Sequence, residues 1–364
     1  MKRLFSISGL VLVFLGLLAG LWQVIQPLDR LNRVSLYNSI FPGRERLPFG
    51  ESPQSAYNFS IGSLDAAFAS HKINASVKKD TNEFRIAAIG DSSGWGTLLR
   101  PEETFCARLD GMALSDGRTI RCYNLAYPTL SLAKDYLLLN RAMTYDPDLI
   151  LWPLTLESFP NDKQTSNELI LSNWDEYCSL FPEKAGEEKV VTPLEKSVWG
   201  ERREAADWLR LQLYGLMWAG TGIDQDYPAE YPAAQVDLDE DNSFHGIEGP
   251  LTEDLLAWDI LEKGMDRAGS TPVLLINEPM LISDGENSKI RYNYYYPREA
   301  YDSWHQDLTG RAEKNGWYLL DLWNSLEIPD FTNSAIHYNA ESALRLADLV
   351  FAEIEKIITN GPLS

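Results

Sequence analysis

A serine that directly follows a short apolar segment is the first candidate for chemistry in this chain. Gly90, Asp91 and Ser92 come after FRIAAI at 84–89, which has the length and composition of a buried strand. A serine on a tight turn between a strand and a helix has its hydroxyl held at the sheet edge, and its own N–H can help to stabilise an oxyanion. The alternative is that Asp91 and Ser92 only cap a helix.

Because a serine hydroxyl needs a base to take its proton, the catalytic interpretation requires a histidine. The sequence has four, namely His71, His245, His305 and His337. His337 lies between a predicted strand and the last predicted helix, at the sheet edge where Ser92 is expected. The others lie before the sheet, in an irregular region and within a predicted helix. We therefore predict Ser92 as the nucleophile and His337 as the general base.

Five strand-like segments alternate with helical patterns and would position these residues. The segments are apolar along their length, at 84–89, 119–125, 148–154, 272–277 and 317–321. Helical spacing occurs between them, and a last helix begins near Asn339, a good N-cap. Apolar strands that alternate with helices predict an α/β fold with a parallel sheet covered on both faces. The carboxyl edge of such a sheet holds the ligand site.

The interval 160–270 departs from this alternation. It is rich in tryptophan and carries an acidic run at 237–241, which is typical of a solvated loop because consecutive carboxylates do not converge on a cation without a folded loop. We expect an insertion that caps the carboxyl edge of the sheet. The predicted domain therefore runs from 83 to 364 with an interruption at 160–270. Residues 27–82, punctuated by prolines, are expected to form a stalk and lead-in.

These blocks resemble the SGNH (GDSL-like) hydrolases and acyltransferases. The resemblance covers about 84–358 outside the insertion and rests on Gly90-Asp91-Ser92, on NLAYPT at 124–129, and on HYN at 337–339 before the last helix. It implies a flavodoxin-like three-layer α/β/α sandwich (the SGNH hydrolase fold) in which Ser92 is the nucleophile and His337 the base. The apolar N-terminus and an aromatic-rich stretch at 292–304 are also similar to a membrane-anchored, extracytoplasmic branch that moves acyl groups onto cell-surface polymers.

The expected oxyanion hole departs from the family pattern at two positions. Where the family has a glycine whose N–H joins the hole, this chain has Thr129, which keeps an N–H but resists unusual φ. Strict spacing puts Glu157 where the family has an asparagine, and a carboxylate beside a developing oxyanion would oppose catalysis. An asparagine occurs four residues later, at Asn161. The resemblance therefore implies that the N–H groups of Ser92 and Thr129, with the amide of Asn161, hold the oxyanion.

The residue that orients His337 is also displaced. The family has an aspartate three residues before the histidine, and here that position is Ser334. Asp330 or Asn333 could substitute, and a dyad held by a backbone carbonyl is a further alternative. We predict Asp330 for this role. An orienting aspartate sets the histidine tautomer and stabilises the imidazolium, so its absence costs activity.

An apolar stretch without charge opens the chain at 4–25. It is about as long as the roughly 20 residues a helix needs to cross a bilayer. A cleaved signal peptide and a buried core helix are the alternatives, but the stretch exceeds a typical signal-peptide core and no A-x-A-like site ends it. We expect an uncleaved single-pass anchor at 1–26, with the main domain outside the cytoplasm.

Charge and cysteine content exclude several function classes. The net charge of −21 argues against binding a nucleic-acid backbone. The three cysteines lack zinc-ligand spacing, and Cys106 and Cys122 are expected as buried apolar residues. We predict no metal and no cofactor.

Two function classes remain. The first is an anchored serine esterase or O-acyltransferase, with an acylated cell-surface carbohydrate or a small ester as substrate. The second is a catalytically degenerate relative that binds a glycan or an envelope protein partner.

Overall fold

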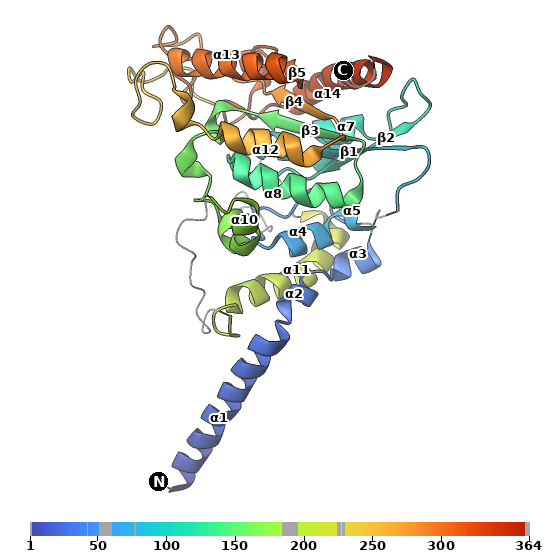
Figure 1. The fold of residues 1–364 in the computed structure, drawn as a ribbon, viewed down its shortest axis with the longest axis vertical. Helices are drawn as coiled ribbons and strands as arrows, with labels where there is room; N and C mark the ends of the chain where they lie inside the picture. The colour runs from blue at the N-terminus through green and yellow to red at the C-terminus, as the bar shows by residue number, and fades with distance from the viewer. Residues whose placement is uncertain are drawn as a thin grey trace.

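A five-stranded parallel sheet forms the centre of the computed structural model, which describes residues 2–41, 43–50, 60–75, 78–183, 196–223, 227 and 230–360. The sheet order is β2-β1-β3-β4-β5, as Figure 1 shows. The strands are β1 (Glu83–Ala88), β2 (Thr119–Asn124), β3 (Leu149–Leu154), β4 (Val273–Asn277) and β5 (Tyr318–Asp321). All four pairings are parallel. The predicted α/β class and its five parallel strands are confirmed.

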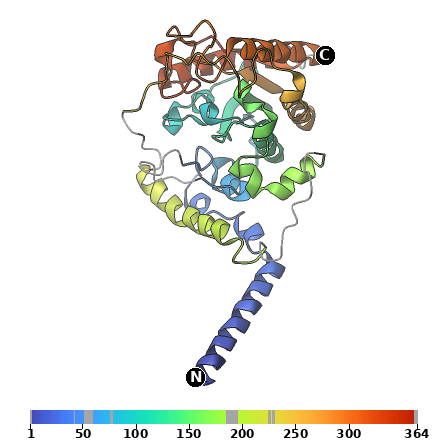
Figure 2. The same cartoon turned by 90° about the vertical axis from the view of Figure 1, so that its left-hand side faces the viewer.

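The N-terminal region and part of the predicted insertion form the base of the molecule (Figures 1 and 2). From the N-terminal side come α1 (Lys2–Ile25), α2 (Leu28–Leu31), α3 (Leu36–Ile40), α4 (Leu64–Ser70) and α5 (Lys72–Ala75). The insertion contributes α9 (Glu168–Ser172), α10 (Trp174–Leu180) and α11 (Arg202–Thr221). Helix α11 contacts α2 and α3. Two helices of the segment 27–82 are thus in contact with the insertion, and this part of the insertion does not cap the carboxyl edge.

Only the second half of the insertion follows the carboxyl edge of the sheet. The N–H of Ala234 bonds the carbonyl of Thr332, and that of Leu238 bonds the carbonyl of Glu286. The predicted end at 270 is too late, because α12 (Trp258–Ala268) packs beside α8 (Leu132–Ala142) on the sheet. The insertion also includes 184–195, which lie outside the described residues.

Helix α1 extends away from the body (Figure 1), with Leu10, Leu17 and Val24 largely exposed. Within the described ranges, no helix combines the length and the apolar character needed to cross a membrane.

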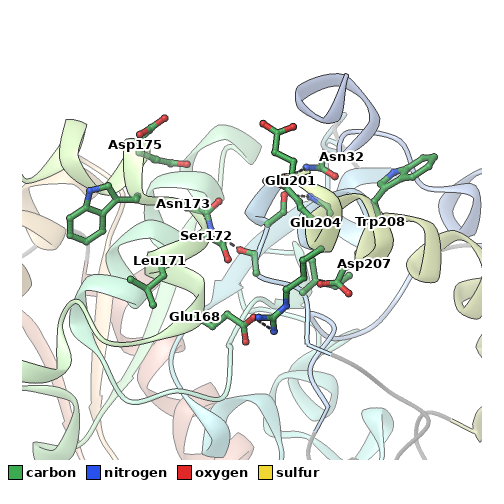
Figure 3. Close-up of a pocket in the computed structure, with 18 of the residues that line it drawn as sticks. Asn32, Glu168, Leu171, Ser172, Asn173, Asp175, Glu201, Glu204, Asp207 and Trp208 are labelled. Atoms are coloured by element: carbon green, nitrogen blue, oxygen red, sulfur yellow. Dashed lines mark hydrogen bonds and ion pairs between the residues drawn. The ribbon is translucent and has the colours of Figure 1, made fainter. Parts of the chain in front are cut away.

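A cleft of about 800 Å³ opens at the base, between α9–α10 and α2–α11 (Figure 3). Its lining is mostly polar and includes Glu168, Asp175, Glu204 and Asp207, with the ion pair between Arg203 and Glu168 across it. None of the residues predicted for catalysis lines this cleft.

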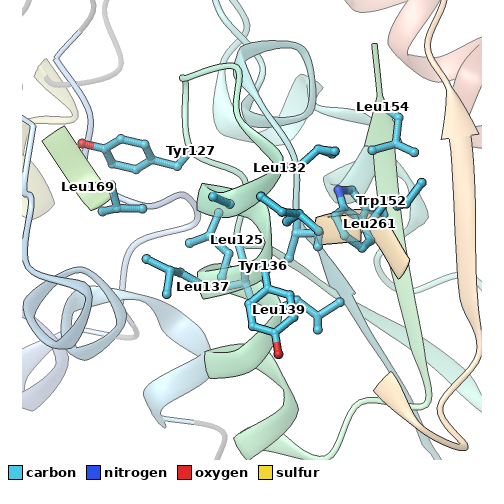
Figure 4. Packing of buried hydrophobic residues seen from close by; sticks show 14 of the residues in the cluster. Leu125, Tyr127, Leu132, Tyr136, Leu137, Leu139, Trp152, Leu154, Leu169 and Leu261 are labelled. Atoms are coloured by element: carbon cyan, nitrogen blue, oxygen red, sulfur yellow. The ribbon is translucent and has the colours of Figure 1, made fainter. Parts of the chain in front are cut away.

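Two apolar layers cover the sheet because its strands alternate their side chains between the faces. On one face, Ile150 and Trp152 of β3 pack against α8 and α12 (Figure 4). On the other face, Leu149 and Leu151 pack against α7 (Phe105–Leu109) and α14 (Ala340–Asn360). Helix α13 (Arg298–Asn315) lies beside β5. The arrangement is the three-layer α/β/α sandwich that the family resemblance implied.

The prediction that Cys106 and Cys122 are simply buried apolar residues is incomplete. Both are buried, but they form a disulfide that joins α7 to β2, with 5.5 Å between their Cα atoms. The spacing of 16 residues carries no signal for this pairing. The packing of α7 on the sheet brings the two side chains together.

Candidate active site

The turn after β1 holds Ser92 at the carboxyl edge of the sheet. Ser92 begins the short helix α6 (Ser92–Trp95), and the Asp91 carboxylate caps it by accepting a hydrogen bond from the N–H of Ser93 at 2.8 Å. Gly90 has φ +125°, a conformation that residues with a side chain rarely adopt. The capping alternative is thus correct for Asp91, while the Ser92 side chain remains available for chemistry.

The Ser92 hydroxyl faces an imidazole. Its Oγ lies 2.8 Å from Nε2 of His337, although 245 residues separate the two in sequence. On the other side of the ring, Nδ1 lies 2.9 Å from Oδ1 of Asn333. The three side chains therefore form a continuous hydrogen-bonded series of the serine–histidine–asparagine type.

This series has a defined direction of proton donation. Because an amide oxygen only accepts hydrogen bonds, Asn333 selects the tautomer in which Nδ1 of His337 carries the proton. Nε2 is then unprotonated and accepts from the Ser92 hydroxyl, which is the arrangement that a general base requires. Asparagine supplies orientation without the negative charge of the usual aspartate.

A tight loop presents the imidazole. Phe331 and Tyr338 pair as an antiparallel bridge, and the N–H of Thr332 bonds the carbonyl of His337 at 2.8 Å. The Tyr294 hydroxyl accepts from the N–H of Ala335 at 2.9 Å. These contacts anchor the loop on both sides of His337, so the ring position is fixed by backbone pairing.

Burial lowers the pKa of His337 to about 4. Desolvation disfavours the imidazolium, and the Asn333 amide brings no charge to offset it. The ring is therefore neutral at physiological pH and able to accept a proton.

The prediction of Asp330 as the orienting residue is wrong. Its carboxylate forms an ion pair with Arg345 and accepts from the N–H of Glu327 at 2.9 Å. Asp330 precedes the bridged loop, whereas Asn333 lies inside it and so meets the ring. Asn333 was one of the sequence-level alternatives, but only the loop geometry distinguishes it from Asp330.

Two of the three predicted oxyanion donors are occupied. The N–H of Thr129 bonds the carbonyl of Tyr127 at 2.7 Å, and the amide of Asn161 donates to the carbonyl of Asp254 at 2.7 Å. Ser92 begins α6, and the first N–H groups of a helix have no partner within it. The N–H of Ser92 is the remaining donor of the predicted set.

Glu157, at the position where the family has an asparagine, is buried. Its carboxylate pairs with Lys163 and with His245. The negative charge of Glu157, which would oppose a developing oxyanion, is therefore paired with these two side chains.

A buried polar network supports the turn that carries Ser92. Lys134 donates to the carbonyls of Gly90 and Tyr127. Glu278 directly follows β4, is buried and hydrogen bonds the Ser93 hydroxyl. Burial, with the neighbouring Asp91 charge, raises the pKa of Glu278 well above its usual range. No pattern in the sequence predicts this network.

In the parts of the chain that the structure describes, no group of three or more His, Cys, Asp or Glu side chains could hold a metal ion.

No family model and no curated protein matches the chain. Among solved structures, it is similar to Est24, a carbohydrate acetylesterase from Sinorhizobium meliloti, at 13% identity and TM-score 0.34, covering 75% of this chain and 99% of that one. It is also similar to the aryl esterase of M. smegmatis in an inhibitor-bound form, at 11% identity and TM-score 0.36, covering 75% and 98%.

Proposed function

We propose that the chain is a serine-dependent esterase that forms an acyl-enzyme on Ser92. The observation that carries the proposal is the 2.8 Å contact between Ser92 Oγ and His337 Nε2, backed by Asn333 at 2.9 Å. Nucleophile, base and orienting group stand in the order that acyl transfer requires.

The proposed reaction has two stages. In the first, Ser92 Oγ attacks the acyl carbonyl while its proton passes to His337 Nε2, and the N–H of Ser92 faces the developing oxyanion. The alcohol then leaves with the proton from His337, and the acyl group stays on Ser92. In the second stage, His337 takes a proton from water or from another alcohol, which attacks the acyl carbon. The bond to Ser92 Oγ then breaks, and Oγ takes the proton back from His337.

Hydrolysis and O-acyl transfer differ only in the acceptor of the second stage. We propose acylated carbohydrates or small esters as substrates, with transfer to a cell-surface polymer as a further outcome in the same site. Exclusion of water by the segment 230–256 along the carboxyl edge would favour transfer.

Labelling with a fluorophosphonate probe tests the acyl-enzyme. We expect the folded protein to be labelled and the Ser92→Ala variant not to be. Ser115→Ala, at an exposed serine paired with Glu355, is the matched control and should be labelled like the wild type. Absence of labelling in the wild type, or equal labelling of Ser92→Ala, would refute the proposal.

The second candidate is a non-catalytic protein of the same fold that binds a glycan or an envelope partner. The occupied N–H of Thr129 and amide of Asn161 favour it, because removing one oxyanion donor costs about 10²–10³ in kcat. The intact series of Ser92, His337 and Asn333 favours the esterase. The labelling experiment separates the two.

We further propose that α1 attaches the protein to a membrane with the main domain outside the cytoplasm. The exposed apolar side chains of α1 support attachment, and the Cys106–Cys122 disulfide supports an oxidising compartment. Recovery of the native chain in the membrane fraction after alkaline carbonate washing, with the domain accessible to protease added outside, would agree with this. Quantitative release by carbonate would refute attachment through α1.

A further inference from the structure

A second carboxylate–imidazole pair lies at the carboxyl edge of the sheet, just after β3. Nε2 of His245 lies 3.0 and 3.1 Å from the two carboxylate oxygens of Glu157. The Glu157 side chain is 6% exposed, whereas that of His245 is 43% exposed. A buried carboxylate therefore fixes a ring whose other side faces solvent.

A tight hairpin presents His245. Phe244 and Ile247 exchange both backbone hydrogen bonds, and His245 and Gly246 at the tip have φ +52° and +81°. Positive φ at both central residues is typical of a type I′ turn, a conformation that is uncommon for residues other than glycine. Phe244 is buried and packs near Tyr296, so the hairpin is held against the sheet edge.

A row of tyrosines connects this pair to the His337 loop. Tyr294 donates from its hydroxyl to Ser334 in that loop at 3.1 Å. Tyr295 lies next in the row, with its ring centre 4.5 Å from that of Tyr294 and 5.8 Å from that of Tyr296. The Tyr296 hydroxyl accepts from the N–H of Glu157 at 3.4 Å.

The tyrosine row offers aromatic surface between the two histidines. Tyr294 and Tyr295 are partly exposed, whereas Tyr296 is buried beneath them.

The chemistry of this surface fits a hydroxyl-bearing ligand. Because Nε2 of His245 is held by Glu157, Nδ1 is the ring nitrogen left to hydrogen bond a ligand hydroxyl. A polar ring nitrogen beside exposed aromatic faces suits a molecule that carries both hydroxyl groups and C–H surface, such as a sugar ring. From these contacts we infer that His245, with Tyr294 and Tyr295, forms a subsite for the hydroxylated part of the substrate, namely the alcohol that leaves in the first stage or attacks in the second. This inference rests on the proposed function of Ser92.

Two acetyl esters test the subsite. p-Nitrophenyl acetate has an activated leaving group without hydroxyls, whereas an acetylated methyl glucoside has a sugar as its alcohol. In His245→Asn, the ratio of kcat/KM for the sugar ester to that for p-nitrophenyl acetate should fall roughly tenfold, about the value of one hydrogen bond. Asparagine tolerates positive φ, so the hairpin should be retained.

His305→Asn is the matched control, because His305 also pairs with a carboxylate, that of Asp321, at 2.8 Å on α13. It should keep the wild-type ratio. The subsite is overturned if the ratio is unchanged in His245→Asn, if His305→Asn lowers it equally, or if the wild type hydrolyses p-nitrophenyl acetate but not the sugar ester. Failure of the wild type to turn over p-nitrophenyl acetate would instead refute the catalytic role of Ser92.

Discussion

Replacing Asn333 by aspartate should raise the pKa of His337 and strengthen it as a base. In the wild type, burial holds this pKa at about 4, with a neutral amide 2.9 Å from Nδ1. A carboxylate there would stabilise the imidazolium. Because Asn333 is exposed, water screens the pair, and a charge at this range is worth about 1–4 kcal/mol. At 1.36 kcal/mol per pKa unit, the expected rise is about 1–3 units.

The pH profile of kcat/KM for p-nitrophenyl acetate measures this shift. Activity requires neutral His337, so it is lost as pH falls through the pKa of the ring. The acid limb should lie near pH 4 in the wild type. In Asn333→Asp it should move up by about 1–3 units, with a higher plateau because the imidazolium formed in the transition state is stabilised. Added salt should reduce the shift.

Asn315→Asp introduces the same charge on an exposed asparagine at the end of α13 and is the control. An acid limb that stays in place in Asn333→Asp, or that moves equally in Asn315→Asp, would contradict the role assigned to Asn333.

Asp330→Asn should change kcat/KM by less than about twofold, since Asp330 pairs with Arg345; a large loss would restore it as the orienting residue. Glu278→Gln should gain stability relative to the wild type as pH rises in denaturant titrations. The folded pKa of Glu278 lies above its unfolded value, so the wild type loses stability relative to the variant as pH rises above about 4.3; parallel pH profiles would argue against a raised pKa of Glu278. Replacing Cys106 and Cys122 by alanine should cost about 3 kcal/mol of unfolding free energy under oxidising conditions, and reductant should destabilise only the wild type.

The fold was largely predictable because its signals are local. Continuous apolar strands that alternate with helical spacing require a parallel sheet with two covered faces, and this sheet is what the structure contains. Ser92 and His337 were predictable for the same reason. Each follows a strand, and the carboxyl ends of parallel strands meet at one edge.

The remaining parts of the site depend on contacts between distant segments. Asn333 and Asp330 are equally good in sequence, but the bridge between Phe331 and Tyr338 turns only Asn333 toward the ring. The N–H of Thr129 hydrogen bonds within its own turn, to the carbonyl of Tyr127. The carboxylate of Glu157 pairs with His245, which lies on a hairpin 88 residues later.

Sequence by itself determined the α/β class, the strand-end serine and its histidine. Each of these depends on a pattern within a short segment, namely the apolar periodicity of a strand or helix and the position of a residue after a strand. The tertiary structure alone decided which polar group orients His337, which donors are already satisfied, and that Cys106 meets Cys122. The physical reason is that a hydrogen bond or a disulfide depends on ångström-scale approach of side chains, which chain packing sets and residue type does not.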